Sequence, residues 1–226
     1  MKPEVSIVLF VFNEEANLER VLTELVEYLD SAPFRWELIF VDDGSADKSL
    51  HVARSILPSA KTRFTRHETN RGIGAALKTG AALAEGEYLT FLPGDGQLPP
   101  ETIGRLFAAR EGADLVTSVY ESRRKDGPLR KLLSAGVRAL IFAVHGVSME
   151  SDGPYLIRRT LFDPAQLGSD SFFLNFEVPI RASASKMASR VVPADCRPRL
   201  GGRSKTANLK TTARVALDLI ALRFRG

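Results

Sequence analysis

The first 118 residues repeat one pattern four times: a short apolar run, a polar turn, and then apolar residues at helical spacing. The apolar runs predict buried strands over 5–10, 36–41, about 63–65 and 88–92. The intervening stretches predict helices that include 18–29, 47–57, an Ala-rich segment ending at 84 and a start near 99. Alternating strands and helices predict an α/β fold with a mostly parallel sheet and helices on both faces.

Acidic residues follow three of the predicted strands, at the sheet edge where helix N-termini converge and ligands bind. They are Glu14 and Glu15, Asp42 and Asp43, and Asp95. Grouped carboxylates repel unless a cation or a donor lies between them, and Mg²⁺ or Mn²⁺ on a diphosphate meets that need. Helix capping is the competing interpretation for Asp47 and for Asn13, which lies at an N-cap position. It fits Asp95 less well, because two glycines flank that residue.

Charge is distributed unevenly along the 226 residues. Residues 1–118 hold 12 Lys and Arg against 18 Asp and Glu, whereas 119–226 hold 19 against 9. A basic second half indicates an anionic partner such as a phospholipid or a phosphate ester, with a solvated basic surface as the alternative. Nucleic acid is disfavoured because few aromatic residues stand among these cations. We expect one domain over 1–205, divided after residue 118, and a basic amphipathic helix over 206–226.

Cysteine content and hydropathy bear on location. Cys196 is the single cysteine, so an intrachain disulfide is impossible. The chain starts in a strand pattern without a signal-peptide pattern, and the apolar run 139–149 is shorter than the roughly 20 residues that span a bilayer. We therefore expect a cytoplasmic protein. The three histidines, His51, His67 and His145, are expected to be structural or exposed, because their spacing is not that of metal ligands.

Five motifs stand in the order and spacing of one enzyme family. They are Phe12-Asn13-Glu14-Glu15 with Asn17, Val41 to Asp47, Asn70-Arg71-Gly72 through Lys78-Thr79-Gly80, Asp95 to Glu101, and Arg199 to Lys205. Together they resemble the family-2 inverting glycosyltransferases of GT-A fold, in the dolichol-phosphate-mannose-synthase-like branch. The resemblance implies transfer of a sugar from GDP-mannose or a UDP-sugar to a polyprenyl or dolichyl phosphate, with Mg²⁺ or Mn²⁺ as cofactor. It makes 1–118 the nucleotide-sugar half of the domain and 119–205 the acceptor half.

The resemblance also implies roles for individual residues. The donor nucleotide would be bound by Phe12, Asn13, Glu14, Asp42, Asp43, Gly44, Ser45, Asn70, Gly72 and Lys78. Asp95 and Gln97 would be metal ligands, and together with Arg123 and Arg199 would form the catalytic set. The acceptor phosphate would be bound by Arg124, Arg130, Arg138, Ser204 and Lys205, since guanidinium groups bind phosphate bidentately.

The sequence departs from the branch at two places. Pro93 stands where the metal motif usually has an Asp, which predicts weaker metal binding or a greater dependence on Gln97, donor phosphates and water. Met149 and Pro154 replace an Asp and an aromatic residue of the branch, which leaves the acceptor open.

Two other functions compete with this interpretation. A transferase acting on a soluble or glycan hydroxyl would need a carboxylate base, for which Asp152, Asp170 and Glu177 are candidates. A degenerate, non-catalytic nucleotide-sugar-binding protein is the other, although the retained Asp95 and Gln97 argue against it. An NAD enzyme is disfavoured because the three-glycine pattern after the first strand is missing.

The C-terminal residues 211–225 read as a basic amphipathic helix that lies on an anionic membrane or packs on the domain. The lipid acceptor that the resemblance implies adds two expectations: the protein is peripheral on the cytoplasmic face of the membrane, and it has a membrane-spanning partner subunit.

Overall fold

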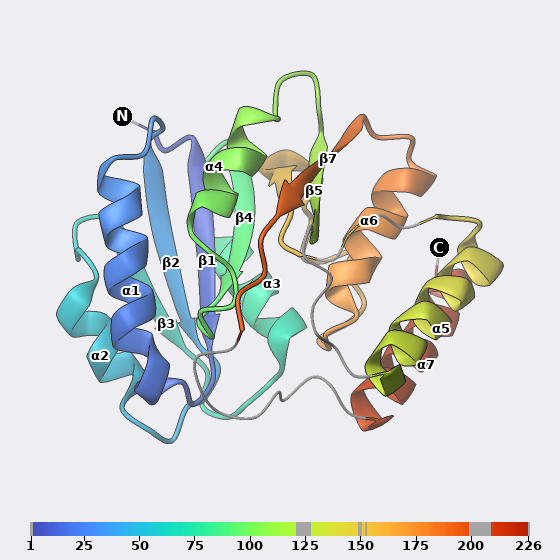
Figure 1. Cartoon of the computed structure of the whole chain (residues 1–226), viewed down its shortest axis with the longest axis horizontal. Helices are drawn as coiled ribbons and strands as arrows, with labels where there is room; N and C mark the ends of the chain where they lie inside the picture. The colour runs from blue at the N-terminus through green and yellow to red at the C-terminus, as the bar shows by residue number, and fades with distance from the viewer. Residues whose placement is uncertain (1, 121–127, 149–150, 152, 199–208, 226) are drawn as a thin grey trace.

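The computed structural model describes residues 2–120, 128–148, 151, 153–198 and 209–225. The described chain alternates strands and helices, as the sequence predicts (Figure 1). Its elements are β1 (Val5–Val11), α1 (Glu15–Asp30), β2 (Trp36–Asp42), α2 (Ser49–Ile56), β3 (Thr62–Arg66), α3 (Ile73–Leu83), β4 (Tyr88–Pro93), α4 (Glu101–Ala108), β5 (Leu115–Tyr120), α5 (Pro128–His145), β6 (Leu156–Arg158), the 3₁₀ turn Arg159–Leu161, α6 (Leu174–Ala184), β7 (Ser189–Ala194) and α7 (Leu209–Arg225).

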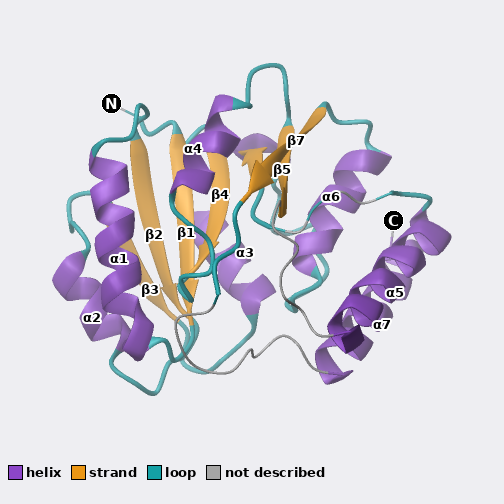
Figure 2. Ribbon diagram, viewed as in Figure 1, coloured by secondary structure: helices purple, strands orange, loops and turns teal. Residues whose placement is uncertain are grey.

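The strands form one seven-stranded sheet in the order β3-β2-β1-β4-β6-β5-β7. Strands β1, β2, β3 and β4 pair in parallel, and β5 pairs in parallel with β7. Within the described sheet, β6 alone runs antiparallel, against β4 and β5. Figure 2 shows the parallel strands β2, β1 and β4 side by side. The predicted mostly parallel sheet is confirmed. Its strand ends after β1, β2, β3 and β4 therefore lie along one edge.

Two separate apolar cores cover the two faces of the sheet, because successive side chains of a strand point to opposite sides. In β1, Ile7 and Leu9 contact the core formed with α1, α2 and α4. The intervening Val8 contacts the core formed with α3 and α6. A Cβ on Gly80 would clash with Val8, so the glycine lets α3 pack closely on the sheet.

A third apolar cluster joins α5, α6 and α7 at one end of the molecule, where Figure 1 shows α5 and α7 side by side. Its buried members are Ile141, Phe173, Ile180, Val215, Leu219 and Leu222. The carboxylate of Asp218 also accepts hydrogen bonds from the hydroxyls of Ser169 (2.9 Å) and Ser171 (2.7 Å). One face of α7 therefore packs on the domain.

Large apolar side chains also lie exposed on α5 and α7: Phe142 (62% exposed), Leu217 (64%), Ile220 (44%) and Phe224 (84%). We call these four residues the apolar face. None of the described helices is long and apolar enough to cross a membrane.

The residues after Gly153 form regular elements although their sequence shows no clear strand or helix pattern. Strand β6, helix α6 and strand β7 all lie there. Helix α6 contains Pro179 and is buried on several sides, so its sequence lacks the one-sided apolar spacing of a surface helix. Strand β7 is largely exposed, and an apolar run does not mark it.

Candidate active site

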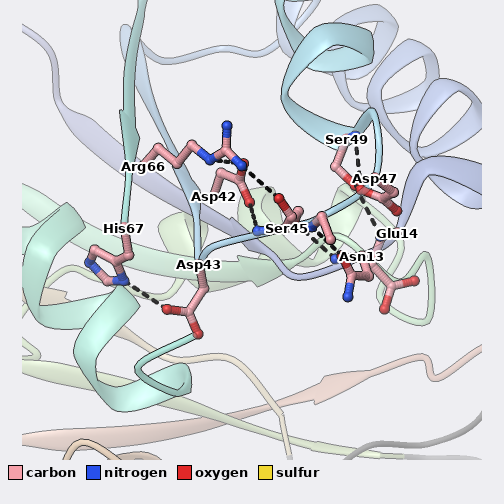
Figure 3. Close-up of polar contacts among 10 residues, drawn as sticks. Asn13, Glu14, Asp42, Asp43, Ser45, Asp47, Ser49, Arg66 and His67 are labelled. Atoms are coloured by element: carbon pink, nitrogen blue, oxygen red, sulfur yellow. Dashed lines mark hydrogen bonds and ion pairs between the residues drawn. The ribbon is translucent and has the colours of Figure 1, made fainter. Parts of the chain in front are cut away.

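The loops that follow β1 and β2 are joined by reciprocal hydrogen bonds (Figure 3). The Asn13 N–H donates to Ser45 Oγ (2.9 Å), and the Ala46 N–H donates to Asn13 Oδ1 (2.8 Å). The Glu14 N–H donates to Ser49 Oγ (3.0 Å). Asn13 is held with φ at 51°, a left-handed conformation that Asn tolerates better than most residues. These contacts hold the loops after β1 and β2 together.

The expectation that Asn13 caps α1 was wrong. Its side-chain oxygen bonds across to Ala46 of the neighbouring loop. The cap comes instead from Asp47, whose Oδ2 accepts from the Glu15 N–H at the start of α1 (3.1 Å). Asp47 Oδ1 accepts from the Ser49 N–H (3.0 Å) and hydroxyl (2.6 Å), so the same carboxylate caps α2. The capping interpretation of Asp47 is confirmed.

Replacement of Asp47 by Ala should lower the free energy of unfolding by about 1–2 kcal/mol, since one cap contributes about 1 kcal/mol and Asp47 serves two helices. Denaturant unfolding measures this loss. Calorimetry with a nucleoside diphosphate should show affinity within about twofold of the wild type. A tenfold loss of affinity at unchanged stability would instead place Asp47 in the binding site.

Asp42 ends β2 with its side chain 1% exposed. Its Oδ1 accepts from the Ser45 N–H (2.8 Å). Its Oδ2 lies 3.3 Å from Nε of Arg66, a half-exposed residue whose guanidinium also donates to the Ser45 carbonyl (2.7 Å). Arg66 and Asp42 therefore form an ion pair, but the two atoms are not aligned for a hydrogen bond. Asp42 Oδ2 has no hydrogen-bond partner among the described residues. A buried carboxylate oxygen without a hydrogen bond marks a place for a donor group.

Asp43 is also buried, and both of its oxygens bind the chain itself. Oδ1 accepts from the Arg71 N–H (2.9 Å), and Oδ2 accepts from the Gly72 N–H (2.9 Å). Nδ1 of His67 lies 2.7 Å from Oδ1 (Figure 3). Asp43 therefore shapes the loop before α3, in which Gly72 has φ of 96°.

The loop after β4 carries Asp95 and Gln97. The Gly94 N–H bonds the Phe10 carbonyl (3.1 Å), which holds the start of the loop against β1. The Gln97 N–H donates to Asp95 Oδ1 (3.1 Å). The backbone of Arg197 then pairs with Gln97, since the Arg197 N–H donates to the Gln97 carbonyl (2.8 Å). The chain just before the predicted Arg199–Lys205 element thus returns to the predicted metal ligands.

Lys78 lies on α3 and contacts the loop that precedes α6. Its ammonium pairs with Asp170 (2.5 Å) and donates to the Leu167 carbonyl (3.3 Å). The buried carboxylate of Glu177 holds the same loop by accepting from the Gly168 N–H (3.0 Å). Two of the predicted alternative bases, Asp170 and Glu177, are thus both engaged in contacts that order this loop.

A model of the family described as "Glycosyl transferase family 2" matches residues 6–178, which include all four strand-end loops. The chain belongs to glycosyl transferase family 2.

Relatives of this family-2 chain include prenyl-phosphate sugar transferases. A dodecaprenyl-phosphate galacturonate synthase of Rhizobium johnstonii is 31% identical over 98% of this chain and 67% of its own length. An undecaprenyl-phosphate 4-deoxy-4-formamido-L-arabinose transferase of Salmonella choleraesuis is 33% identical over 71% of this chain and 50% of its own length. The chain thus spans about two thirds of the length of the first relative and half of the second.

Solved structures establish the GT-A fold. Glucosyl-3-phosphoglycerate synthase from Mycobacterium tuberculosis, in complex with phosphoglyceric acid, matches with a TM-score of 0.76 at 22% identity, over 98% of this chain and 80% of that one. The same protein with Mn²⁺, UDP-glucose and phosphoglyceric acid gives a TM-score of 0.75 at 21% identity, over the same shares of the two chains.

The structure brings the predicted donor residues of this family-2 chain to one edge of the sheet. Asp42 is the last residue of β2, and Lys78 lies on α3. The other predicted donor residues lie in the loops after β1, β2 and β3: Phe12, Asn13, Glu14, Asp43, Gly44, Ser45, Asn70 and Gly72. Their roles as nucleotide ligands remain predictions. Gly44 has φ of 76°, and a side chain there would clash with the backbone of Thr69 and Asn70. The glycine therefore lets the loops after β2 and β3 pack closely.

Most of the residues predicted to bind the acceptor or to join in catalysis from the second half lie outside the part of the chain that the structure describes. Arg123, Arg124, Arg199, Ser204 and Lys205 lie outside the described residues, as do Met149 and Asp152. Arg130 and Arg138 lie on α5, the helix that packs with α7.

Sequence reasoning missed Arg66, His67 and Arg197 as neighbours of the site. Arg66 and His67 carry a usable signal, because they directly follow β3 and β3 is adjacent to β2, whose end carries Asp42 and Asp43. Arg197 carried none, since its contact with Gln97 joins positions 100 residues apart.

Proposed function

We propose that this chain transfers a sugar from a nucleoside diphosphate sugar to a polyprenyl phosphate at a membrane surface, with inversion at the anomeric carbon. One observation carries the proposal. The motif residues Glu14, Asp42 and Asp95 come from separate strands, and the parallel sheet brings their loops to one edge. A relative that aligns with 98% of this chain is named a dodecaprenyl-phosphate galacturonate synthase, which supports a prenyl phosphate as the acceptor.

Asp95 and Gln97 would hold the divalent cation. Carboxylate and amide oxygens suit Mg²⁺ and Mn²⁺, which keep water and phosphate oxygens in the rest of their shell. Within the described residues, no three His, Cys, Asp or Glu side chains are grouped to hold a metal by themselves. When bound, the cation would stabilise negative charge on the departing nucleoside diphosphate.

The acceptor phosphate determines which catalytic groups are needed. A phosphate monoester is largely ionised near neutral pH, with a second pKa of about 6, so its oxygen attacks without a general base. Its oxygen forms a bond to the anomeric carbon as the bond from that carbon to the diphosphate oxygen breaks. The chain must therefore bind and orient the two substrates and neutralise the charge of their phosphates. Asp170 and Glu177 then serve to order the loop before α6, through the contacts described above.

Product formation tests the function directly. The protein is incubated with UDP-sugars or GDP-mannose, Mn²⁺ and a polyprenyl phosphate, and lipid-linked sugar is measured by mass spectrometry. A prenyl-phosphate sugar with the inverted anomeric configuration is the expected product. Transfer to a soluble hydroxyl acceptor in place of the lipid would overturn the proposal.

The apolar face would meet the membrane, with the chain as a peripheral protein on the cytoplasmic side. Residues 197–225 hold eight Lys and Arg against the single acid Asp218. Exposed Arg138 and Arg223 lie on the same two helices as the apolar face. Apolar side chains beside cations suit the surface of an anionic bilayer, where each cation contributes about 1 kcal/mol.

Double replacement of Leu217 and Phe224 by Ser should reduce co-sedimentation with anionic liposomes by at least about tenfold. Each side chain is more than half exposed, so its loss removes insertion without opening the core. High salt should also release the wild-type protein, because the Debye length is about 8 Å at physiological ionic strength. Point variants are preferred to truncation after Thr206, which would uncover Ile141, Phe173 and Ile180.

A matched control is Val191→Ser, which removes an exposed apolar side chain from β7 (44% exposed), outside the apolar face. This variant should bind liposomes like the wild type. Equal binding of the wild type to neutral and anionic liposomes, or no loss in the double variant, would contradict docking through the apolar face.

A further inference from the structure

We propose that His67 is a positioning residue of the nucleotide site: its Nδ1–H orients the Asp43 carboxylate, which in turn fixes the backbone of Arg71 and Gly72. The inference rests on the proposed function, because the loop that it orders carries predicted donor contacts. His67 itself holds the loop through Asp43, with no contact to donor required.

The His67 ring lies between two elements. The residue directly follows β3, and its N–H donates to the Asp42 carbonyl (2.9 Å). The residue is 7% exposed, with Nδ1 2.7 Å from Asp43 Oδ1 and Nε2 2.9 Å from Thr79 Oγ on α3. The ring therefore links the end of β2 to α3 through two hydrogen bonds.

The partners determine which nitrogen carries a proton. An ionised carboxylate only accepts hydrogen bonds, so Nδ1 must be protonated to bond Asp43. In the neutral ring Nε2 then accepts, and the Thr79 hydroxyl donates to it. An imidazolium carries the same Nδ1–H, so the contact to Asp43 exists in both protonation states.

The Asp43 carboxylate aligns two backbone groups at once. Oδ1 accepts from the Arg71 N–H and Oδ2 from the Gly72 N–H, each at 2.9 Å. Rotation of the carboxyl group about its Cβ–Cγ bond would misalign both bonds. The His67 contact to Oδ1 opposes that rotation. Gly72, with φ of 96°, then leads into α3, so a turned carboxylate would release the loop at its most unusual backbone position.

A positioning role differs from simple filling of the core, and two substitutions separate them. Asn places its Nδ2 the same number of bonds from the backbone as His Nδ1, so His67→Asn keeps a donor for Asp43. His67→Leu keeps apolar bulk and removes the donor. If the His67 side chain only fills space, the Leu variant should retain nucleotide affinity better. If it positions Asp43, the Asn variant should retain it better.

The experiment measures the affinity of His67→Asn and His67→Leu for UDP and for GDP, each with Mn²⁺, by calorimetry. His67→Leu should weaken the affinity of the nucleotide that the wild type binds by about tenfold or more, and His67→Asn should stay within about threefold. His51→Leu, at an exposed histidine on α2, is the matched control and should bind like the wild type. Equal losses in the Asn and Leu variants, or no loss in the Leu variant, would overturn the inference.

A readout without ligand separates this inference from the proposed function. Amide hydrogen exchange of Arg71 and Gly72 should accelerate about tenfold or more in His67→Leu and remain near the wild-type rate in His67→Asn. If the wild type binds neither nucleotide, the proposed function fails while this result still decides the role of His67. If His67→Leu does not fold, the imidazole ¹⁵N spectrum of the wild type decides, and a ring protonated at Nε2 alone overturns the inference.

Discussion

Replacement of Asp95 by Asn should lower kcat/KM for sugar transfer by about 100-fold or more while the fold is kept. The change removes the negative charge but keeps an oxygen that can accept from the Gln97 N–H, which lies 3.1 Å from Asp95 Oδ1. A cation that stabilises the leaving diphosphate contributes several kcal/mol, and a weaker ligand charge loses much of it. Transfer rates across a Mn²⁺ titration, together with circular dichroism, measure the effect.

Turnover within about twofold of the wild type, with unchanged metal dependence, would show that Asp95 is not a ligand. The reciprocal change is Pro93→Asp, at the last residue of β4, which should tighten the apparent Mn²⁺ affinity by adding the carboxylate that the branch usually has there. Gln97→Ala should also reduce transfer, because without an acid at 93 its amide oxygen is a larger part of the ligand set.

The fold was predictable where local pattern and tertiary packing agree. Strands such as β1 and β2 are buried along almost their whole length, so continuous apolar runs mark them. The second half departs from this rule. Strand β6 is antiparallel and has only three residues. Strand β7 is fixed in the sheet by its pairing with β5, and its own hydropathy does not mark it as a strand. Long-range pairing of this kind leaves no periodic signal in a single sequence.

The candidate site was predictable as a set of strand ends but not as a set of contacts. Parallel strands place their carboxyl ends on one edge, so Asp42, Asp43 and Asp95 could be assigned there from the order of elements alone. Which carboxylate faces a ligand and which orders the chain depends on the partners that folding brings. Asp42 and Asp43 are adjacent and chemically identical, yet one has an oxygen without a hydrogen bond and the other binds two backbone N–H groups.

That difference predicts that two neighbouring substitutions will differ in their effect on stability. Asp42→Ala should weaken nucleoside diphosphate affinity by about 10- to 100-fold, the range for a hydrogen bond to a charged group, and should change kcat less. Asp43→Ala should lower the free energy of unfolding by about 2–4 kcal/mol, because the N–H groups of Arg71 and Gly72 lose their acceptor, and should weaken nucleotide affinity at least as much as His67→Leu does. Calorimetry and denaturant unfolding on both variants measure the two effects.

For a ligand to reach Asp42, the Arg66 guanidinium must move aside, and that side chain is 52% exposed and has solvent in which to do so. Binding at Asp42 therefore replaces the Arg66 guanidinium with a hydrogen-bond donor of the ligand. The affinity lost in Asp42→Ala then measures how much stronger the ligand's hydrogen bond to Asp42 is than the Arg66 ion pair. Unaltered affinity in both variants would place the nucleotide elsewhere on the sheet edge. An affinity loss in Asp43→Ala that matches its loss of stability, with Asp42→Ala silent, would make the ordered loop, and not the Asp42 oxygen, the part of the site that recognises the donor.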